Sequence, residues 1–233
     1  MCGIVGYVGP RQCSTLLLDG LKRLEYRGYD SAGLALHDGR DVRVVRVQGK
    51  LARLEQALAE RPLAGTTGIG HTRWATHGRP NETNAHPHLV DGIAVVHNGI
   101  IENHLELKAM LAEQGTAFSS ETDTELIAHL VAGAARQGKE LLEAVRHALY
   151  RLRGSYAIAV VSARDPGTIV VAKNASPLVI GVGEGENHAA SDVPAILPYT
   201  RRMLFLDEGE IARLRADSVQ IERLDGTPVR REP

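Results

Sequence analysis

The order of strand-like and helix-like segments is the strongest constraint on the fold of this chain. Strand patterns occupy residues 3–8, 32–37, 42–47, 67–72 and 93–97, and they return in short runs between 156 and 224. Helical spacing of apolar residues is found at 13–25, at 51–60 and across 102–152. Strands, then helices, then strands are typical of an α+β domain rather than of alternating βα units. Residues 157–161 are apolar at every position, which indicates sheets covered on both faces.

The length of 233 residues fits one domain with a sizeable core. Turn-forming and charged residues crowd the last segment, 225–233, which has little apolar surface. We therefore predict one domain over residues 1–224 and a linker-like tail over 225–233.

Charge and cysteine content limit the classes of binding partner and the cellular compartment that we predict for this protein. Lys and Arg total 27 against 28 Asp and Glu, so no basic face is expected and nucleic acid is not a predicted partner. No apolar stretch approaches the roughly 20 residues of a membrane helix, and the N-terminus lacks the pattern of a secretory signal. The two cysteines do not form a disulfide framework. These features predict a cytoplasmic protein without a membrane partner.

Cys2 is the first candidate for chemistry. A thiol needs a base to become a nucleophile at neutral pH, and removal of Met1 would give Cys2 a free α-amine with a pKa near 8. The alternative is an incidental cysteine in a disordered terminus, but a strand begins at Gly3 and would hold the terminus in a sheet. Cys13 competes as a thiol at a helix start, yet no base lies near it in sequence, so a structural role is expected.

The segment 71–78 follows a strand and ends in turn formers, which predicts a loop at a sheet edge. Arg73 offers a planar fork suited to a carboxylate. Trp74 is the only tryptophan of the chain and could cover a pocket. The alternative is a surface loop with one buried aromatic side chain.

Two short motifs are ambiguous on local grounds. Asn98 and Gly99 could provide two N–H donors to an oxyanion, but Asn-Gly is also a common tight-turn pair, and the turn is favoured when the pair is considered alone. Thr122 and Glu125 fit a helix capping box, which would place Asp123 in the first helical turn for structural reasons.

Several histidines lie close together in sequence and raise the possibility of a metal site. The pair His86 and His88 does not have zinc-ligand spacing, and neither cysteine lies in this region. We therefore expect no metal.

Taken together, these motifs resemble the N-terminal-nucleophile (class II) glutamine amidotransferases. The resemblance rests on residues 1–6, 27–33, 71–78, 97–99 and 122–123, all in order and spread over essentially the whole chain. Within that family the chain is most similar to the branch that passes ammonia to fructose 6-phosphate to make glucosamine 6-phosphate. The resemblance implies a four-layer αββα sandwich and a glutaminase that needs no cofactor.

The resemblance also implies a role for each motif residue. It makes Cys2 the nucleophile and its α-amine the base, with the Asn98 side chain and the Gly99 N–H holding the oxyanion. It assigns the following residues to L-glutamine binding: Arg73, Trp74, Thr76, His77 and Asp123. It gives Arg27 a supporting role in positioning Cys2.

The resemblance further implies sugar-isomerase domains, either in the same polypeptide or as a separate subunit, through which an oligomer could form. Two alternatives remain at this stage. One is the glutaminase domain of another class II amidotransferase. The other is a non-catalytic glutamine-binding module, which would be indicated by loss of Cys2, Asn98 or Asp123, and all three are present.

Overall fold

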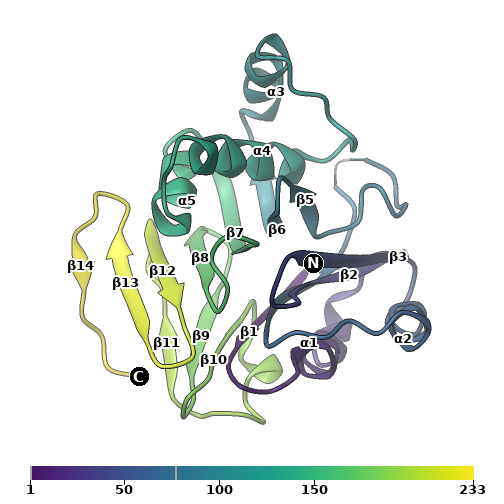
Figure 1. Ribbon diagram of the computed structural model, residues 1–233, viewed down its shortest axis with the longest axis vertical. Helices are drawn as coiled ribbons and strands as arrows, with labels where there is room; N and C mark the ends of the chain where they lie inside the picture. The colour runs from purple at the N-terminus through teal and green to yellow at the C-terminus, as the bar shows by residue number, and fades with distance from the viewer. Residues whose placement is uncertain (1, 77) are drawn as a thin grey trace.

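The computed structural model of the protein describes residues 2–76 and 78–233 (Figure 1). In this part of the chain two seven-stranded sheets with antiparallel strand pairing lie face to face. The first sheet has the order β11-β9-β10-β1-β4-β2-β3. Its strands are β1 (Gly3–Val8), β2 (Ser31–His37), β3 (Val42–Gln48), β4 (Thr67–Arg73), β9 (Val179–Val182), β10 (Asn187–Ala190) and β11 (Met203–Phe205).

The second sheet has the order β14-β13-β12-β8-β7-β6-β5. Its strands are β5 (His88–Val90), β6 (Ile93–Ile101), β7 (Gly154–Ser162), β8 (Ile169–Asn174), β12 (Glu210–Leu214), β13 (Val219–Arg223) and β14 (Pro228–Val229). The helices are α1 (Cys13–Lys22), α2 (Leu51–Glu60), α3 (His104–Glu113), α4 (Asp123–Arg136) and α5 (Leu141–Leu149), with 3-10 turns at Glu25–Arg27 and Val193–Ala195.

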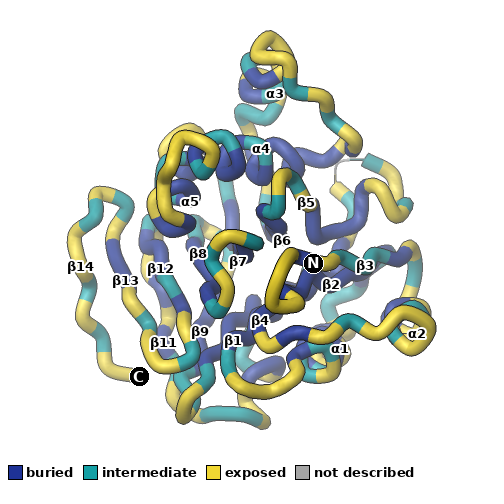
Figure 2. The backbone as a smooth tube through the Cα atoms, viewed as in Figure 1, coloured by how far each residue is buried: buried dark blue, intermediate teal, exposed yellow. Residues whose placement is uncertain are grey.

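Three buried apolar layers hold the sandwich together. One lies between the sheets, where Ile4 and Ile69 of the first sheet meet Val96 and Val171 of the second. A second joins α1 and α2 to the outer face of the first sheet, and a third joins α4 and α5 to the outer face of the second. Figure 2 shows the buried strands in the middle and the exposed loops and helix faces outside. The predicted αββα sandwich is confirmed.

Two local predictions were wrong. The strand expected at 93–97 continues to Ile101, so Asn98 and Gly99 lie in β6 rather than in a tight turn. Pairing with β7 across positions Asn98↔Ala157 and Gly99↔Tyr156 overrides the local turn preference. The residues His71–Arg73 likewise belong to β4, which lies between β1 and β2 in the sheet, and the loop begins only at Trp74.

The tail over 225–233 makes contacts with the second sheet. The short strand β14 pairs with β13, and the Arg231 guanidinium forms ion pairs with Asp207 and Glu210. None of the described helices is long and apolar enough to cross a membrane.

Candidate active site

A cavity of about 440 Å³ collects most of the residues predicted for the site. Its lining comprises Cys2, Arg27, Trp74, Thr76, Asn98, Gly99, Ile100, Ser155, Ser176 and Pro177. Cys2 directly precedes β1 of the first sheet, whereas Asn98 and Gly99 belong to β6 of the second. The site is therefore assembled across the two sheets.

The Cys2 thiol is half-buried and is held by the backbone of Trp74. The Trp74 N–H donates to Sγ at 3.2 Å, and Sγ lies 3.6 Å from the Trp74 carbonyl oxygen. Burial raises the pKa of Cys2, and the Trp74 N–H counteracts this only in part. The thiol is thus protonated at neutral pH, and attack requires a base to remove its proton.

The loop after β4 is held by Asp30, a residue of the 27–33 motif for which the sequence analysis predicts no role. Asp30 accepts a hydrogen bond from the Ala75 N–H at 2.7 Å, and its own N–H donates to the Arg73 carbonyl at 2.8 Å. These bonds hold the two residues that flank Trp74 and so place the Trp74 N–H on the thiol. The Trp74 side chain is 54% exposed, so it is not the buried aromatic of the alternative interpretation.

Asn98 and Gly99 line the same cavity as Cys2. The Asn98 Nδ2 donates to the Cys2 carbonyl oxygen at 3.2 Å. Gly99 has a φ of +135°, and a Cβ at this position would lie 2.1 Å from the Ser155 carbonyl oxygen. Only glycine fits this backbone. A side-chain amide and a backbone amide that line one cavity with a thiol are the groups that stabilise an oxyanion in acyl transfer.

Arg27 contacts the backbone of Cys2. Its Nη1 lies 3.3 Å from the Cys2 carbonyl oxygen and 2.8 Å from Ser191 Oγ, and its Nη2 lies 3.7 Å from Asp192 Oδ2. Because Asn98 donates to the same carbonyl, two side chains hold the backbone of Cys2. The positioning role of Arg27 stays a prediction, and these contacts show only that its guanidinium reaches the Cys2 backbone.

Arg73 and Asp123 are not among the residues that line the cavity. Arg73 directly precedes the lining residue Trp74, and Asp123 accepts from the N–H of Ile101, which follows the lining residue Ile100. Both are buried, at 3% and 6% exposure. The Arg73 Nη2 donates to the Gly78 carbonyl at 3.0 Å, and Asp123 Oδ2 accepts from the Ile101 N–H at 2.9 Å. Burial lowers the pKa of Arg73, and electrostatic interactions with Asp30, Cys2 and Asp123 act in the opposite direction. Arg73 is thus a buried cation that interacts electrostatically with Cys2 and Asp123.

Thr122 caps α4 as predicted, since its Oγ1 accepts from the Glu125 N–H at 3.4 Å. The Glu125 carboxylate, however, bonds to the backbone N–H groups of Ser119 and Ser120 rather than completing a reciprocal box. Asp123 occupies the first turn of this helix. The predicted ligand residue His77 lies outside the described residues.

Cys13 is fully buried at the start of α1, and burial raises its pKa to about 12. It is therefore an unreactive thiol. The sequence analysis also missed Ile100, Ser155, Ser176 and Pro177 at the cavity. They come from strand pairing and from the loop after β8, and no local motif marks them.

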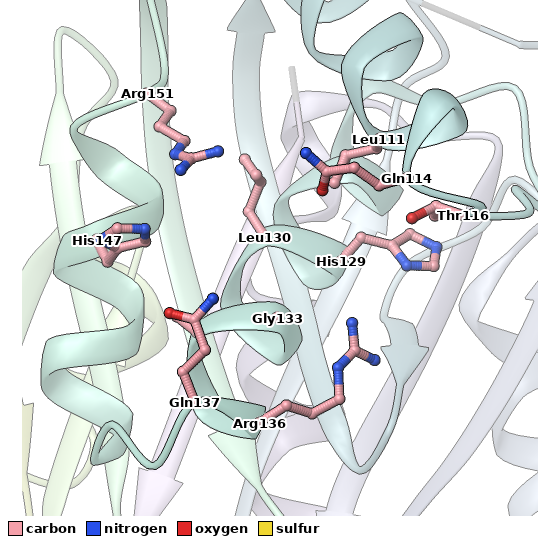
Figure 3. Close-up of a pocket in the computed structure, with 11 residues that line it drawn as sticks. Leu111, Gln114, Thr116, His129, Leu130, Gly133, Arg136, Gln137, His147 and Arg151 are labelled. Atoms are coloured by element: carbon pink, nitrogen blue, oxygen red, sulfur yellow. The ribbon is translucent and has the colours of Figure 1, made fainter.

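A second cavity of about 230 Å³ lies among α3, α4 and α5, with His129, Arg136 and His147 in its lining (Figure 3). It shares no lining residue with the cavity at Cys2. Among the described residues, no group of three or more His, Cys, Asp or Glu side chains is arranged to hold a metal ion.

Comparison with known proteins adds independent information. The sequence profile of the glutamine amidotransferase domain family matches residues 71–198. The chain is 57% identical to the glutamine–fructose-6-phosphate aminotransferase [isomerizing] of Thermus thermophilus and 54% identical to that of Escherichia coli. Each alignment covers 100% of this chain but only 38% of the relative, so the chain spans well under half the length of these enzymes.

Solved structures show the same fold. The glutamine phosphoribosylpyrophosphate amidotransferase of B. subtilis superimposes with a TM-score of 0.82 at 28% identity, over 96% of this chain and 49% of that one. A glutamine aminotransferase class-II domain protein from Silicibacter pomeroyi superimposes with a TM-score of 0.63 at 14% identity, over 96% of this chain and 99% of that one. At this low identity the second match supports the fold alone.

Proposed function

The chain belongs to the glutamine amidotransferase domain family, and we propose that it hydrolyses L-glutamine to glutamate and ammonia through a thioester on Cys2. The observation that carries this proposal is the convergence of the Cys2 thiol, the Asn98 amide and Gly99 on one cavity. The cavity volume of about 440 Å³ falls within the range of small-molecule sites.

The chemistry follows from the positions of these groups. The Cys2 thiolate attacks the side-chain amide carbon of glutamine, and the carbonyl oxygen becomes an oxyanion stabilised by Asn98 Nδ2 and the Gly99 N–H. The C–N bond then breaks, and ammonia leaves after the nitrogen takes a proton. Water attacks the resulting glutamyl thioester through a second oxyanion, which releases glutamate and restores the thiol.

The proposed base is the α-amine of Cys2 after removal of Met1. The raised pKa of the thiol makes such a base necessary, and an amine with a pKa near 8 is matched to the task. A sample that retains Met1 should therefore show no turnover even though its thiol is intact. Intact-mass measurement paired with activity tests this, and full activity with Met1 retained would disprove the α-amine mechanism.

Substrate binding is assigned by proposal to residues around the loop after β4. Arg73 would take the α-carboxylate of glutamine, because a buried guanidinium gains most from an anionic partner. Thr76 and His77 would assist, Trp74 would close over the substrate, and Asp123 would take the α-ammonium group.

The proposed recipient of the ammonia is fructose 6-phosphate, to give glucosamine 6-phosphate. The chain is 54–57% identical to two glutamine–fructose-6-phosphate aminotransferases but only 28% identical to the phosphoribosylpyrophosphate amidotransferase, which supports fructose 6-phosphate as the acceptor. The remaining length of the relatives would supply the sugar-isomerase part, in the same polypeptide or as a second subunit.

The central experiment measures glutamate and ammonia together after incubation with glutamine. The two products should appear in equal amounts, and no glucosamine 6-phosphate should form from this chain alone when fructose 6-phosphate is added. Cys2→Ala should abolish turnover, whereas Cys13→Ala removes the matched buried thiol and should retain it. A glutamine-like diazoketone should label Cys2. Labelling at Cys13 alone, or absence of both products from the wild type, would refute the proposal.

A further inference from the structure

The side chain of His71 reaches from the first sheet to the oxyanion group of the second. His71 lies in β4 and is fully buried. Its Nε2 is 2.9 Å from Asn98 Oδ1 and 3.1 Å from the carbonyl oxygen of His97. His71 itself is not among the residues that line the cavity, and it reaches the site through Asn98.

Two backbone carbonyls determine the direction of these hydrogen bonds. The His97 carbonyl only accepts, so His71 Nε2 must carry the hydrogen and the Asn98 atom facing it must be the oxygen. At the other end of the amide, Asn98 Nδ2 faces the Cys2 carbonyl, which also only accepts. Both ends therefore require the same orientation of the Asn98 amide.

His71 is neutral, and its hydrogen is held on Nε2. Burial lowers the pKa of His71 to about 3, so the ring is neutral at physiological pH. Its buried Nδ1 has no hydrogen-bond partner among the described residues. Moving the proton to Nδ1 would leave Nε2 without a hydrogen for two facing oxygens. The Nε2–H tautomer is thus the one that the surroundings stabilise.

We propose that His71 is a positioning residue that holds the Asn98 amide by its oxygen and so directs the N–H₂ group toward the oxyanion. The proposal rests on the proposed glutaminase function. Without the His71 donor, only the bond from Nδ2 to the Cys2 carbonyl opposes a half-turn of the amide, and the rotated amide would present its oxygen to the developing negative charge. That orientation repels the oxyanion instead of stabilising it.

The test is a double-mutant cycle in the full chain, with glutamine turnover as the readout. His71→Leu should lower kcat by about 10–100-fold, part of the 10²–10³ expected for losing an oxyanion donor, and change KM by less than about threefold. In the Asn98→Ala background the same substitution should cost less than about threefold, because the amide it orients is already absent.

His86→Leu is the matched control. His86 is a fully buried neighbour whose ring centroid lies 4.4 Å from that of His71, but its Nε2 bonds to Thr124 Oγ1 and not to Asn98. Any factor that it costs in kcat should therefore be the same with and without the Asn98 side chain. A general loss of packing would behave like this control.

A second pair of variants serves if His71→Leu does not fold. The amide of Gln extends far enough to donate near the position of Nε2, whereas the amide of Asn is one carbon shorter. His71→Gln should thus retain most of kcat, and His71→Asn should lose about as much as His71→Leu. Equal activity of the Gln and Asn variants would overturn the proposal, and so would an equal fall in kcat on His71→Leu in both Asn98 backgrounds. In either case turnover by the wild type would leave the proposed glutaminase function intact. A wild type that releases no ammonia overturns both.

Discussion

Replacing Gly99 with alanine tests whether the backbone of β6 is shaped for the oxyanion rather than for the sheet alone. The substitution adds one methyl group at a φ of +135°, a conformation that costs a non-glycine residue about 1–3 kcal/mol. The new Cβ would lie 2.1 Å from the Ser155 carbonyl oxygen and 3.0 Å from the Tyr156 Cα, both on the backbone of β7. Neither neighbour can turn away as a flexible side chain can.

The size of the effect follows from these two terms. Overpacking adds about 1–3 kcal/mol, so the free energy of unfolding should fall by about 2–6 kcal/mol in total. For 233 residues each kcal/mol lowers Tm by about 2–4 °C, which gives a fall of at least about 4 °C. Relief of the contact requires β6 to move away from β7, and this displaces Asn98 and the Gly99 N–H together. We therefore expect kcat to fall by about 10²–10³ as well.

Calorimetry and a glutamine turnover assay measure the two effects on the same samples. Gly133→Ala is the control, since Gly133 lies inside α4 and the nearest atom to an added Cβ is 3.9 Å away. That change should raise stability by up to about 1 kcal/mol and leave kcat unchanged. A Gly99→Ala variant with wild-type Tm and kcat would refute the argument from conformation and close approach.

Three further predictions address other parts of the site. Asn98→Ala should lower kcat by about 10²–10³ with KM little changed, and steady-state kinetics would contradict the oxyanion role if only KM rose. Asp123→Asn should mainly raise KM. A lowered Tm with unchanged kinetics would mean that Asp123 only stabilises the fold through its hydrogen bond with the Ile101 N–H. Burial lowers the pKa of His71 and His88 from 6.5 to about 3, so between these pH values the unfolded chain binds more protons than the folded chain. The free energy of unfolding should be fully retained above pH 6.5 and should fall below that pH by up to about 1.4 kcal/mol per pH unit for each histidine. Urea titrations at a series of pH values measure this free energy. A flat profile would contradict the prediction.

The sequence predicted the layers well because its strands carry their own signal. Runs such as residues 157–161 are apolar at every position, and β7 is buried there on both faces. The strand β10 was missed, since Asn187–Ala190 contains no β-branched or aromatic residue apart from the imidazole of His188. Its pairing with β1 and β9 makes it a strand, and such tertiary pairing is absent from a local pattern.

The site was predictable only where several weak motifs occurred together. Asn98 and Gly99 alone favour a turn, and the neighbouring strand β7 decides otherwise. Ser176 reaches the cavity from a part of the chain outside every motif, and Asp30 lies within the motif 27–33, but nothing in that motif predicts its bond to the Ala75 N–H. The tautomer of His71 depends on a partner 27 positions away, which only the folded chain reveals.

The pairing of β1 has a consequence for the timing of biosynthesis. This strand, which follows Cys2, is hydrogen-bonded to β4 on one side and to β10 on the other. A ribosome that adds about 5–20 residues per second needs roughly 10–40 s to reach Asn187, the first residue of β10. Throughout that interval β1 lacks one of its two neighbours, and the proposed mechanism requires Met1 to be removed. β1 is therefore synthesised long before its second neighbour, β10, can pair with it.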